Sequence, residues 1–186
     1  AVDAASTGDE VIVLPGTYTS SDTQVVDLLG KVITLRSSEG AEVTIIDGQS
    51  LRRGVRCDSG ESSSTAIEGF TITNGQAGDG AGIYVRDGSP SISDCIFTSN
   101  LATDNGGGVF IRDGSSSLTN CMVLNNSSSS DGGGIFIRTG IPQLTNCTIR
   151  DNETSGEGGG IICRDEGDAL ILGCFIESND AGQVGG

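Results

Sequence analysis

A 26-residue repeat is the feature that most constrains how this chain can fold. Four successive segments begin at Ala81, Gly107, Gly133 and Gly159, and the period slips to 27 once near the end. Such a fixed period is typical of solenoid proteins. The repeat places similar residues in five columns, which are Ile83/Val109/Ile135/Ile161, Val85/Ile111/Ile137/Cys163, Cys95/Cys121/Cys147/Cys174, Phe97/Val123/Ile149/Ile176 and Asn74/Asn100/Asn126/Asn152/Asn179.

Within each repeat the column residues alternate with other residues. Ile83 and Val85 are separated by Tyr84, and this period of two indicates a β-strand with one face turned inward. A repeat of this length has no room for a helix beside two strands and their turns. Strands that return at each repeat must lie parallel, about 4.8 Å apart. The sequence therefore predicts an all-β protein, a right-handed parallel β-helix (solenoid) of about 6–7 rungs.

The turns and the ends of the chain agree with this fold. The glycine-rich corners allow backbone angles that a β-carbon forbids, and the asparagine column suits turns bonded from rung to rung. Before Ala81 the pattern is looser, and a short helical turn is expected near the start. We expect residues 1–30 to form an N-terminal cap and a first irregular rung, and residues 31–186 to form a single β-helix domain that continues in a longer parent protein.

Composition excludes several classes of partner. The chain has a formal net charge of −15, whereas binding to nucleic acid or adsorption to an anionic membrane needs a basic surface. No run of about 20 apolar residues is present, so no membrane span is expected. Only 4% of residues are aromatic and 35% are hydrophobic, which suits a thin solenoid with a narrow core.

The N-terminal third carries a family resemblance. GDEVIVLPGTYT from Gly8 and GKVITLRSSEGAEVTIIDGQ from Gly30 resemble the opening of bacterial pectin-lyase-like β-helix proteins. The later repeats resemble those of chlamydial polymorphic outer-membrane proteins. The resemblance implies an extracellular or cell-surface location. It implies little about activity, because this fold carries lyases, hydrolases, epimerases, adhesins and phage spikes. In related enzymes, the outer face of one parallel sheet is the sugar groove.

An outward line of aromatic and arginine residues is the main candidate for a binding site. If Ile83, Val85 and their equivalents point inward, the residues between and after them point outward. Exposed aromatic rings beside guanidinium groups favour binding of a polysaccharide or a protein surface. The alternative is that each arginine pairs with the neighbouring Asp87, Asp113 or Asp165 and shields the aromatic ring. The predicted binding residues are Tyr84, Phe110, Phe136, Arg86, Arg112, Arg138 and Arg164, with Ile162 at the end of the aromatic line.

Other candidate chemistry is weaker. The stacked cysteines are read as buried thiols that act as small hydrophobic residues. Zinc is excluded because the chain has no histidine and no CxxC motif. Asp79, Asp131 and Glu157 share a corner column with Asn105, where Ca²⁺ is a minor alternative to solvated charge. No other cofactor is predicted. Partial Ser/Thr ladders leave ice binding as a third, minor idea.

The predicted function is a non-catalytic secreted or cell-surface module for adhesion, polysaccharide or protein binding, or self-assembly. The Arg-Asp pair recurs as a ladder, and a single active site does not require several copies. The alternative is a polysaccharide lyase, hydrolase or epimerase of the pectin-lyase-like fold, in which acidic pairs do the acid–base work. An uncovered C-terminal rung also predicts a homo-oligomer or end-to-end assembly.

Overall fold

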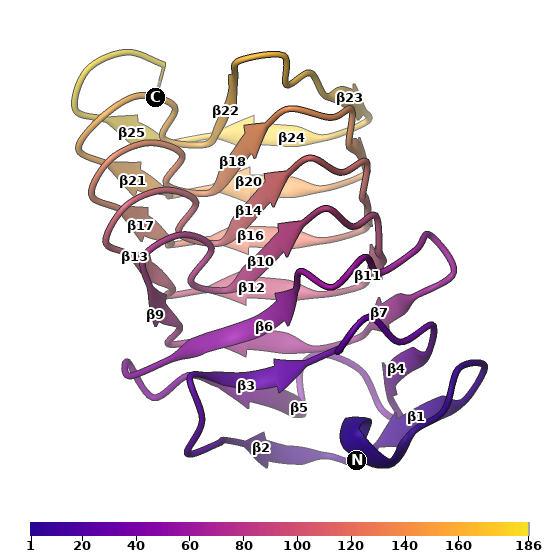
Figure 1. Cartoon of the computed structure of the whole chain (residues 1–186). Helices are drawn as coiled ribbons and strands as arrows, with labels where there is room; N and C mark the ends of the chain where they lie inside the picture. Colours follow the sequence, from indigo (N-terminus) through magenta and orange to yellow (C-terminus); the bar gives the residue numbers. More distant parts are fainter. Residues whose placement is uncertain (186) are drawn as a thin grey trace.

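The computed structural model describes residues 1–185 as a right-handed parallel β-helix, which confirms the predicted fold class (Figure 1). Its strands form four parallel sheets along the solenoid. The predicted end of the domain at residue 186 lies outside the described residues. The first sheet has the order β1(Glu10–Val13), β4(Thr34–Ser37), β7(Ala66–Glu68), β11(Ser91–Ser93), β15(Ser117–Thr119), β19(Gln143–Thr145) and β23(Leu170–Leu172).

The other three sheets complete each turn. The second has the order β2(Gly16–Tyr18), β5(Thr44–Asp47), β8(Thr71–Thr73), β12(Ile96–Thr98), β16(Met122–Leu124), β20(Thr148–Arg150) and β24(Phe175–Glu177). The third, of two-residue strands, has the order β9(Gln76–Ala77), β13(Leu101–Ala102), β17(Ser127–Ser128), β21(Glu153–Thr154) and β25(Asp180–Ala181). The fourth, here called the arginine sheet, has the order β3(Gln24–Asp27), β6(Arg53–Cys57), β10(Ile83–Arg86), β14(Val109–Arg112), β18(Ile135–Arg138) and β22(Ile161–Arg164).

Strand register follows the repeat from β10 onward. Ile83 pairs with Val109, and Val109 pairs with Ile135, as the 26-residue period requires. Gln143 pairs with Leu170, where the period slips to 27. The earlier turns are irregular, since Leu35 pairs with Ile67 across a much longer connection. A short 3₁₀ helix, η1(Val2–Ala4), begins the chain, and Val2 packs against the core.

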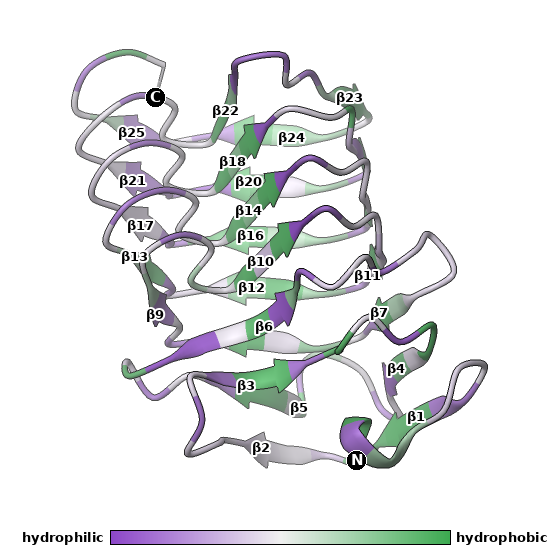
Figure 2. Ribbon diagram, viewed as in Figure 1, coloured by the Kyte–Doolittle hydropathy of each residue, from purple (hydrophilic) through white to green (hydrophobic). Residues whose placement is uncertain are grey.

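The core is one narrow column of apolar side chains inside the four sheets. Val55, Ile83, Val109 and Ile135 are fully buried and belong to one continuous cluster. Figure 2 shows hydrophobic residues concentrated in strands such as β10, β14 and β18, whereas the short strands β17, β21 and β25 and most loops are neutral or polar. Each turn buries its inward residues only against its neighbours, which is the basis of stability in such folds. Side chains on the last described turn are exposed, among them Leu170, Phe175 and Ile176.

An asparagine ladder fixes the corner after the second sheet. The side chains of Asn100, Asn126 and Asn152 are buried, and the Nδ2 group of Asn126 donates to Oδ1 of Asn152 at 3.0 Å and to the Phe97 carbonyl at 2.9 Å. The ladder continues to Asn179, whose Oδ1 accepts from Nδ2 of Asn152 at 2.9 Å. This confirms hydrogen bonding between rungs.

The left-handed backbone lies one residue before each asparagine of the ladder, at Ser99, Asn125, Asp151 and Ser178. The sequence column was wrong for Asn74: β8 pairs with β12 at a spacing of 25 residues, so Asn74, with a φ of 50°, occupies the same turn position as Ser99. The preceding residue makes the turn, so that the asparagine side chain can point inward and bond to the backbone.

The sequence predicts no membrane span. Residues 1–185 contain no helix that is long and apolar enough to cross a membrane.

Candidate functional site

The aromatic line forms a stack on the outside of the arginine sheet. Tyr84 on β10 stacks on Phe110 of β14 with 5.1 Å between ring centroids, and Phe110 stacks on Phe136 of β18 with 5.2 Å. The parallel register produces this stack, because Tyr84, Phe110 and Phe136 occupy the same position in three neighbouring strands. Stacked rings contribute beyond their buried area, so the line stabilises the solenoid.

The prediction that these rings are exposed is wrong for two of them. Phe110 is 4% exposed and Phe136 is 5% exposed, while Tyr84 is partly buried. The glycine-rich corner before each strand folds back over the ring. At Gly106 and Gly132 the backbone is left-handed, and a β-carbon built there would lie 3.0 Å and 2.8 Å from the β-carbons of Phe110 and Phe136. The glycines therefore allow the corner to cover the aromatic stack.

The predicted arginines form a surface row, here called the arginine row, of Arg86, Arg112, Arg138 and Arg164. Their side chains are 43%, 44%, 49% and 39% exposed, in that order. Adjacent members occupy the same register position on neighbouring strands, about 4.8 Å apart. The row is therefore accessible, whereas two of the three aromatic rings beside it are not.

The arginines of the row form ion pairs with nearby carboxylates. Arg112 lies 3.0 Å from Asp113, Arg138 lies 2.6 Å from Asp165, and Arg86 lies 3.5 Å from Asp87. A hydrogen bond from the Thr139 hydroxyl, and then one from Arg112, lowers the pKa of Asp113. The pairing expected as the alternative to a binding role is thus present for Arg86 and Arg112. Asp165 instead pairs with Arg138 of the previous turn, and Arg164 pairs with Asp131 and Glu157. Such exposed ion pairs are weak, so a ligand can compete for either partner.

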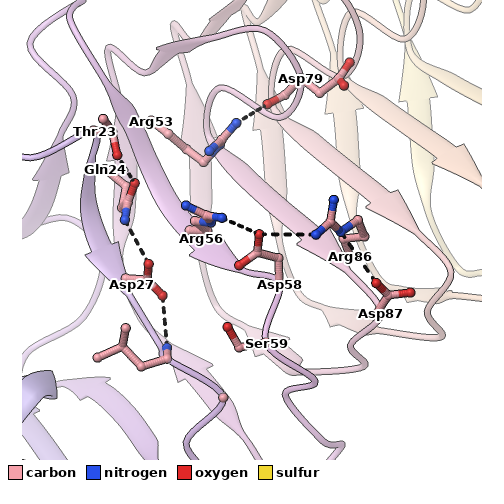
Figure 3. Close-up of polar contacts among 12 residues, drawn as sticks. Thr23, Gln24, Asp27, Arg53, Arg56, Asp58, Ser59, Asp79, Arg86 and Asp87 are labelled. Atoms are coloured by element: carbon pink, nitrogen blue, oxygen red, sulfur yellow. Dashed lines mark hydrogen bonds and ion pairs between the residues drawn. The ribbon is translucent and has the colours of Figure 1, made fainter.

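A cluster that breaks the repeat lies at the N-terminal end of the row. We call it the arginine pocket, and Figure 3 shows its polar contacts. The pocket is a recess of about 300 Å³, lined by Arg53, Arg56, Asp58, Gly78, Asp79, Tyr84 and Arg86.

Asp58 joins two guanidinium groups of the pocket. One of its carboxylate oxygens lies 2.6 Å from Nη2 of Arg56 and 3.9 Å from Nη2 of Arg86. The hydrogen bond from Arg56 lowers the pKa of Asp58 and raises the pKa of Arg56. The Asp58 side chain is 7% exposed and that of Arg56 is 38% exposed, so the carboxylate is shielded from bulk water while the guanidinium remains partly accessible.

Arg53 is fixed differently. Its guanidinium donates to the carbonyls of Asp79 at 2.9 Å and Gly80 at 3.0 Å, and it lies 4.7 Å from the centroid of the Tyr84 ring. Burial, followed by the charge of Arg56, lowers the pKa of Arg53. The group remains a cation, since even a shifted arginine ionises far above neutral pH.

Sequence reasoning missed Arg53, Arg56 and Asp58. A signal was present, because Arg52, Arg53 and Arg56 crowd into five residues of an acidic chain. These residues precede the regular repeats, so the aligned columns did not include them. In the register, Arg56 pairs with Tyr84 and thus occupies the position that is aromatic in the next three turns.

The acidic corner column has a structural role. Oδ1 of Asp79 accepts from the backbone and side-chain nitrogens of Asn105, and Oδ1 of Asp131 accepts from the backbone nitrogen of Glu157 at 2.9 Å. Arg164 pairs with Asp131 at 3.0 Å and with Glu157 at 2.7 Å. Within residues 1–185, no group of three or more His, Cys, Asp or Glu side chains could hold a metal ion.

The six cysteines are free, and four of them are buried. Burial raises the pKa of Cys95 to about 12. The thiols of Cys121 and Cys147 donate to the carbonyls of Ile92 at 3.7 Å and Leu118 at 3.4 Å, in the preceding turns. The predicted buried thiols are thus observed for Cys95, Cys121 and Cys147, whereas Cys174 is only partly buried and Cys163 is exposed.

Comparison with known proteins gives one family. No curated protein and no solved structure matches the chain. A family model described as "Periplasmic copper-binding protein (NosD)" matches residues 2–185, which is nearly the whole chain. The match covers all the turns of the β-helix, including both the arginine pocket and the arginine row. The chain therefore belongs to the NosD family of periplasmic proteins.

Proposed function

We propose that this chain is an exported, non-catalytic β-helix module that binds a polysaccharide along the arginine row. The observation that carries the proposal is the row itself, in which half-exposed arginines recur at strand spacing beside carboxylates. Guanidinium groups donate hydrogen bonds and carboxylates accept them, so the row offers both partners to sugar hydroxyls. A surface with a regular repeat suits a ligand with a regular repeat.

The net charge narrows the class of polysaccharide. At −15 the chain repels a densely acidic polymer, so a neutral or sparsely acidic polysaccharide is favoured. A protein surface was the other partner class expected from the sequence. A location in the periplasm or at the cell surface agrees with the family description.

Affinity electrophoresis through gels containing neutral polysaccharides, with alginate as the acidic comparison, tests this proposal. We expect retardation by at least one neutral polysaccharide, and loss of that retardation in the double variant Arg112→Ala/Arg138→Ala. Arg150→Ala is a matched control, because Arg150 is 44% exposed and paired with Asp151, but lies on the second sheet. Retardation by no polysaccharide, or equal retardation of the double variant, would contradict the proposal.

An enzyme of the lyase, hydrolase or epimerase type is a second candidate, favoured by one observation. The arginine pocket breaks the repeat, as a single active site does. Against it, the two carboxyl groups with shifted pKa values, Asp58 and Asp113, are both shifted downward, which suits ion pairing and not general acid catalysis. Turnover of a uronate polymer, with or without Ca²⁺, that is lost in Asp58→Asn would favour the enzyme.

The matching family is described as copper-binding. The residues of this chain do not fit a resident copper ion. The chain has no histidine, and residues 1–185 hold no group of three metal-ligating side chains. Thiolate sulfur is a good ligand for Cu(I). However, the cysteine thiols at Cys121 and Cys147 donate to backbone carbonyls and are buried. The proposed function therefore does not include copper binding by these residues.

A further inference from the structure

The cysteine column, which consists of Cys95, Cys121, Cys147 and Cys174, brings thiols of adjacent turns together. Cys147 and Cys174 directly precede Thr148 and Phe175, which are partners in the parallel pairing of β20 with β24. Equivalent residues of adjacent parallel strands lie about 4.8 Å apart. This spacing is within the Cα–Cα range of about 4.4–6.8 Å that a disulfide requires. The backbone nitrogen of Cys147 also donates to Sγ of Cys174 at 3.3 Å, so this sulfur already lies against the neighbouring cysteine.

The cysteines of the column differ in exposure. Cys95 and Cys121 are fully buried and Cys147 is 1% exposed, whereas Cys174 is only partly buried. An oxidant in solution can therefore reach the sulfur of Cys174, but not those of Cys95 and Cys121. The column neighbour of Cys174 is Cys147, which makes these two cysteines the pair that an external oxidant can join.

Only weak interactions hold the two sulfurs in their present positions. Sγ of Cys147 donates to the Leu118 carbonyl at 3.4 Å, and Sγ of Cys174 donates to the Leu144 carbonyl at 3.4 Å. A thiol is a weak donor, so little is lost when both side chains rotate toward each other. The family is described as periplasmic, and the bacterial periplasm is a compartment in which disulfides form and persist. A reduced pair would therefore meet an oxidant there.

We propose that Cys147 and Cys174 are joined by a thiol–disulfide oxidant into a disulfide that links the turn of β20 to the turn of β24. The Cys174 thiolate attacks one sulfur of the oxidant disulfide, and one oxidant thiolate leaves. The Cys147 thiolate then attacks the Cys174 sulfur of the mixed disulfide and displaces the second oxidant thiolate. The cysteine pair gives up two electrons and two protons, and the oxidant leaves as two thiols. The inference does not depend on the proposed polysaccharide binding.

Oxidised glutathione, added to the reduced whole chain, tests the inference. The reaction is run at about pH 8.5, because the thiolate is the reacting form and burial raises the pKa of Cys174. The remaining thiols are then blocked with N-ethylmaleimide as the chain is unfolded in urea. Each of the six cysteines lies in a different tryptic peptide, Cys147 in residues 139–150 and Cys174 in residues 165–186. We expect mass spectrometry to find these two peptides joined, with the other four cysteines blocked.

Serine variants identify the pair. Cys147→Ser and Cys174→Ser should each abolish the cross-link, and circular dichroism establishes that both variants are folded. Cys163→Ser is the matched control, because Cys163 is exposed but lies outside the column, and this variant should form the cross-link as the unmodified chain does. Oxidation should also shift the urea midpoint of the unmodified chain upward. It should leave the midpoint of Cys174→Ser unchanged.

Several results would overturn the inference. These are retention of all six thiols after oxidation, a bond from Cys174 to Cys163 in place of Cys147, or a cross-link between two chains on a non-reducing gel. Oxidation in urea gives a further comparison, since equal cross-link patterns in the folded and unfolded chain would mean that the fold does not direct the pairing. Electrophoresis through polysaccharide gels is a separate measurement, and its result bears on the proposed function alone.

Discussion

The guanidinium of Arg53 lies 4.7 Å from the ring centroid of Tyr84, on the side of β10 opposite to Phe110. The opposite sides follow from the sheet order, in which β6 and β14 flank β10. Arg53 therefore ends the aromatic stack that runs through Tyr84, Phe110 and Phe136. Arg53 therefore belongs both to the aromatic stack on the arginine sheet and to the lining of the arginine pocket.

Truncation of the middle ring should destabilise the fold. Phe110 is 4% exposed and contacts a ring on each side, so Phe110→Ala leaves a cavity and should cost about 3–5 kcal/mol in the free energy of unfolding. Urea unfolding followed by circular dichroism measures this. Phe175→Ala is the matched control, because Phe175 is 60% exposed and should change stability by about 0.5 kcal/mol. Equal effects of the two substitutions would show that Phe110 is not covered.

The aromatic stack also shows how far the sequence could predict the site. Alternation along β10 and β14 correctly placed Tyr84 and Phe110 on the outer side of the sheet. Burial of Phe110 depends on the preceding corner at Gly106, which folds back over the ring. A period-two pattern contains no information about a corner that crosses the same face, so exposure could not be predicted from it.

The arginine pocket could not be predicted from the sequence, for a different reason. The inward columns and the fold follow from the repeat, because identical spacing places identical residues in register. Arg53, Arg56 and Asp58 lie before the repeat becomes regular, and Leu35 pairs with Ile67 across an irregular connection. Without a fixed period, the sequence does not show which residues of neighbouring turns meet. Only the structure brings Arg86 to Asp58.

A charge placed in the asparagine ladder should be poorly tolerated. In Asn126→Asp, a carboxylate replaces the amide that donates to Asn152 and to the Phe97 carbonyl. Two donor contacts become repulsive, and the free energy of unfolding at pH 7 should fall by about 3–5 kcal/mol. Asn125→Asp is the control, because Asn125 is exposed and aspartate also tolerates its left-handed backbone. A loss at Asn125 as large as that at Asn126 would contradict the ladder's role.

Stability should depend on pH through Asp58. Its pKa is lowered, chiefly by the hydrogen bond from Arg56, so the stabilisation is present above the ordinary aspartate pKa of about 4 and is lost as pH falls through the lowered value. Asp58→Asn should therefore destabilise the chain more at pH 7 than at pH 2, measured by urea unfolding. Arg56→Gln should remove most of this difference, since it deletes the donor. An Asp58→Asn effect independent of pH would refute the linkage.

The copper description of the family leads to a last prediction for this chain. The thiols of Cys121 and Cys147 are buried donors to backbone carbonyls, and a copper ion would have to displace those hydrogen bonds. In anaerobic competition with a Cu(I) chelator, the folded chain should therefore retain less than an equimolar amount of copper. The urea-unfolded chain, with all six cysteines accessible, should retain more. Tight equimolar binding by the folded chain that disappears in Cys147→Ser would instead place a copper site in the cysteine column.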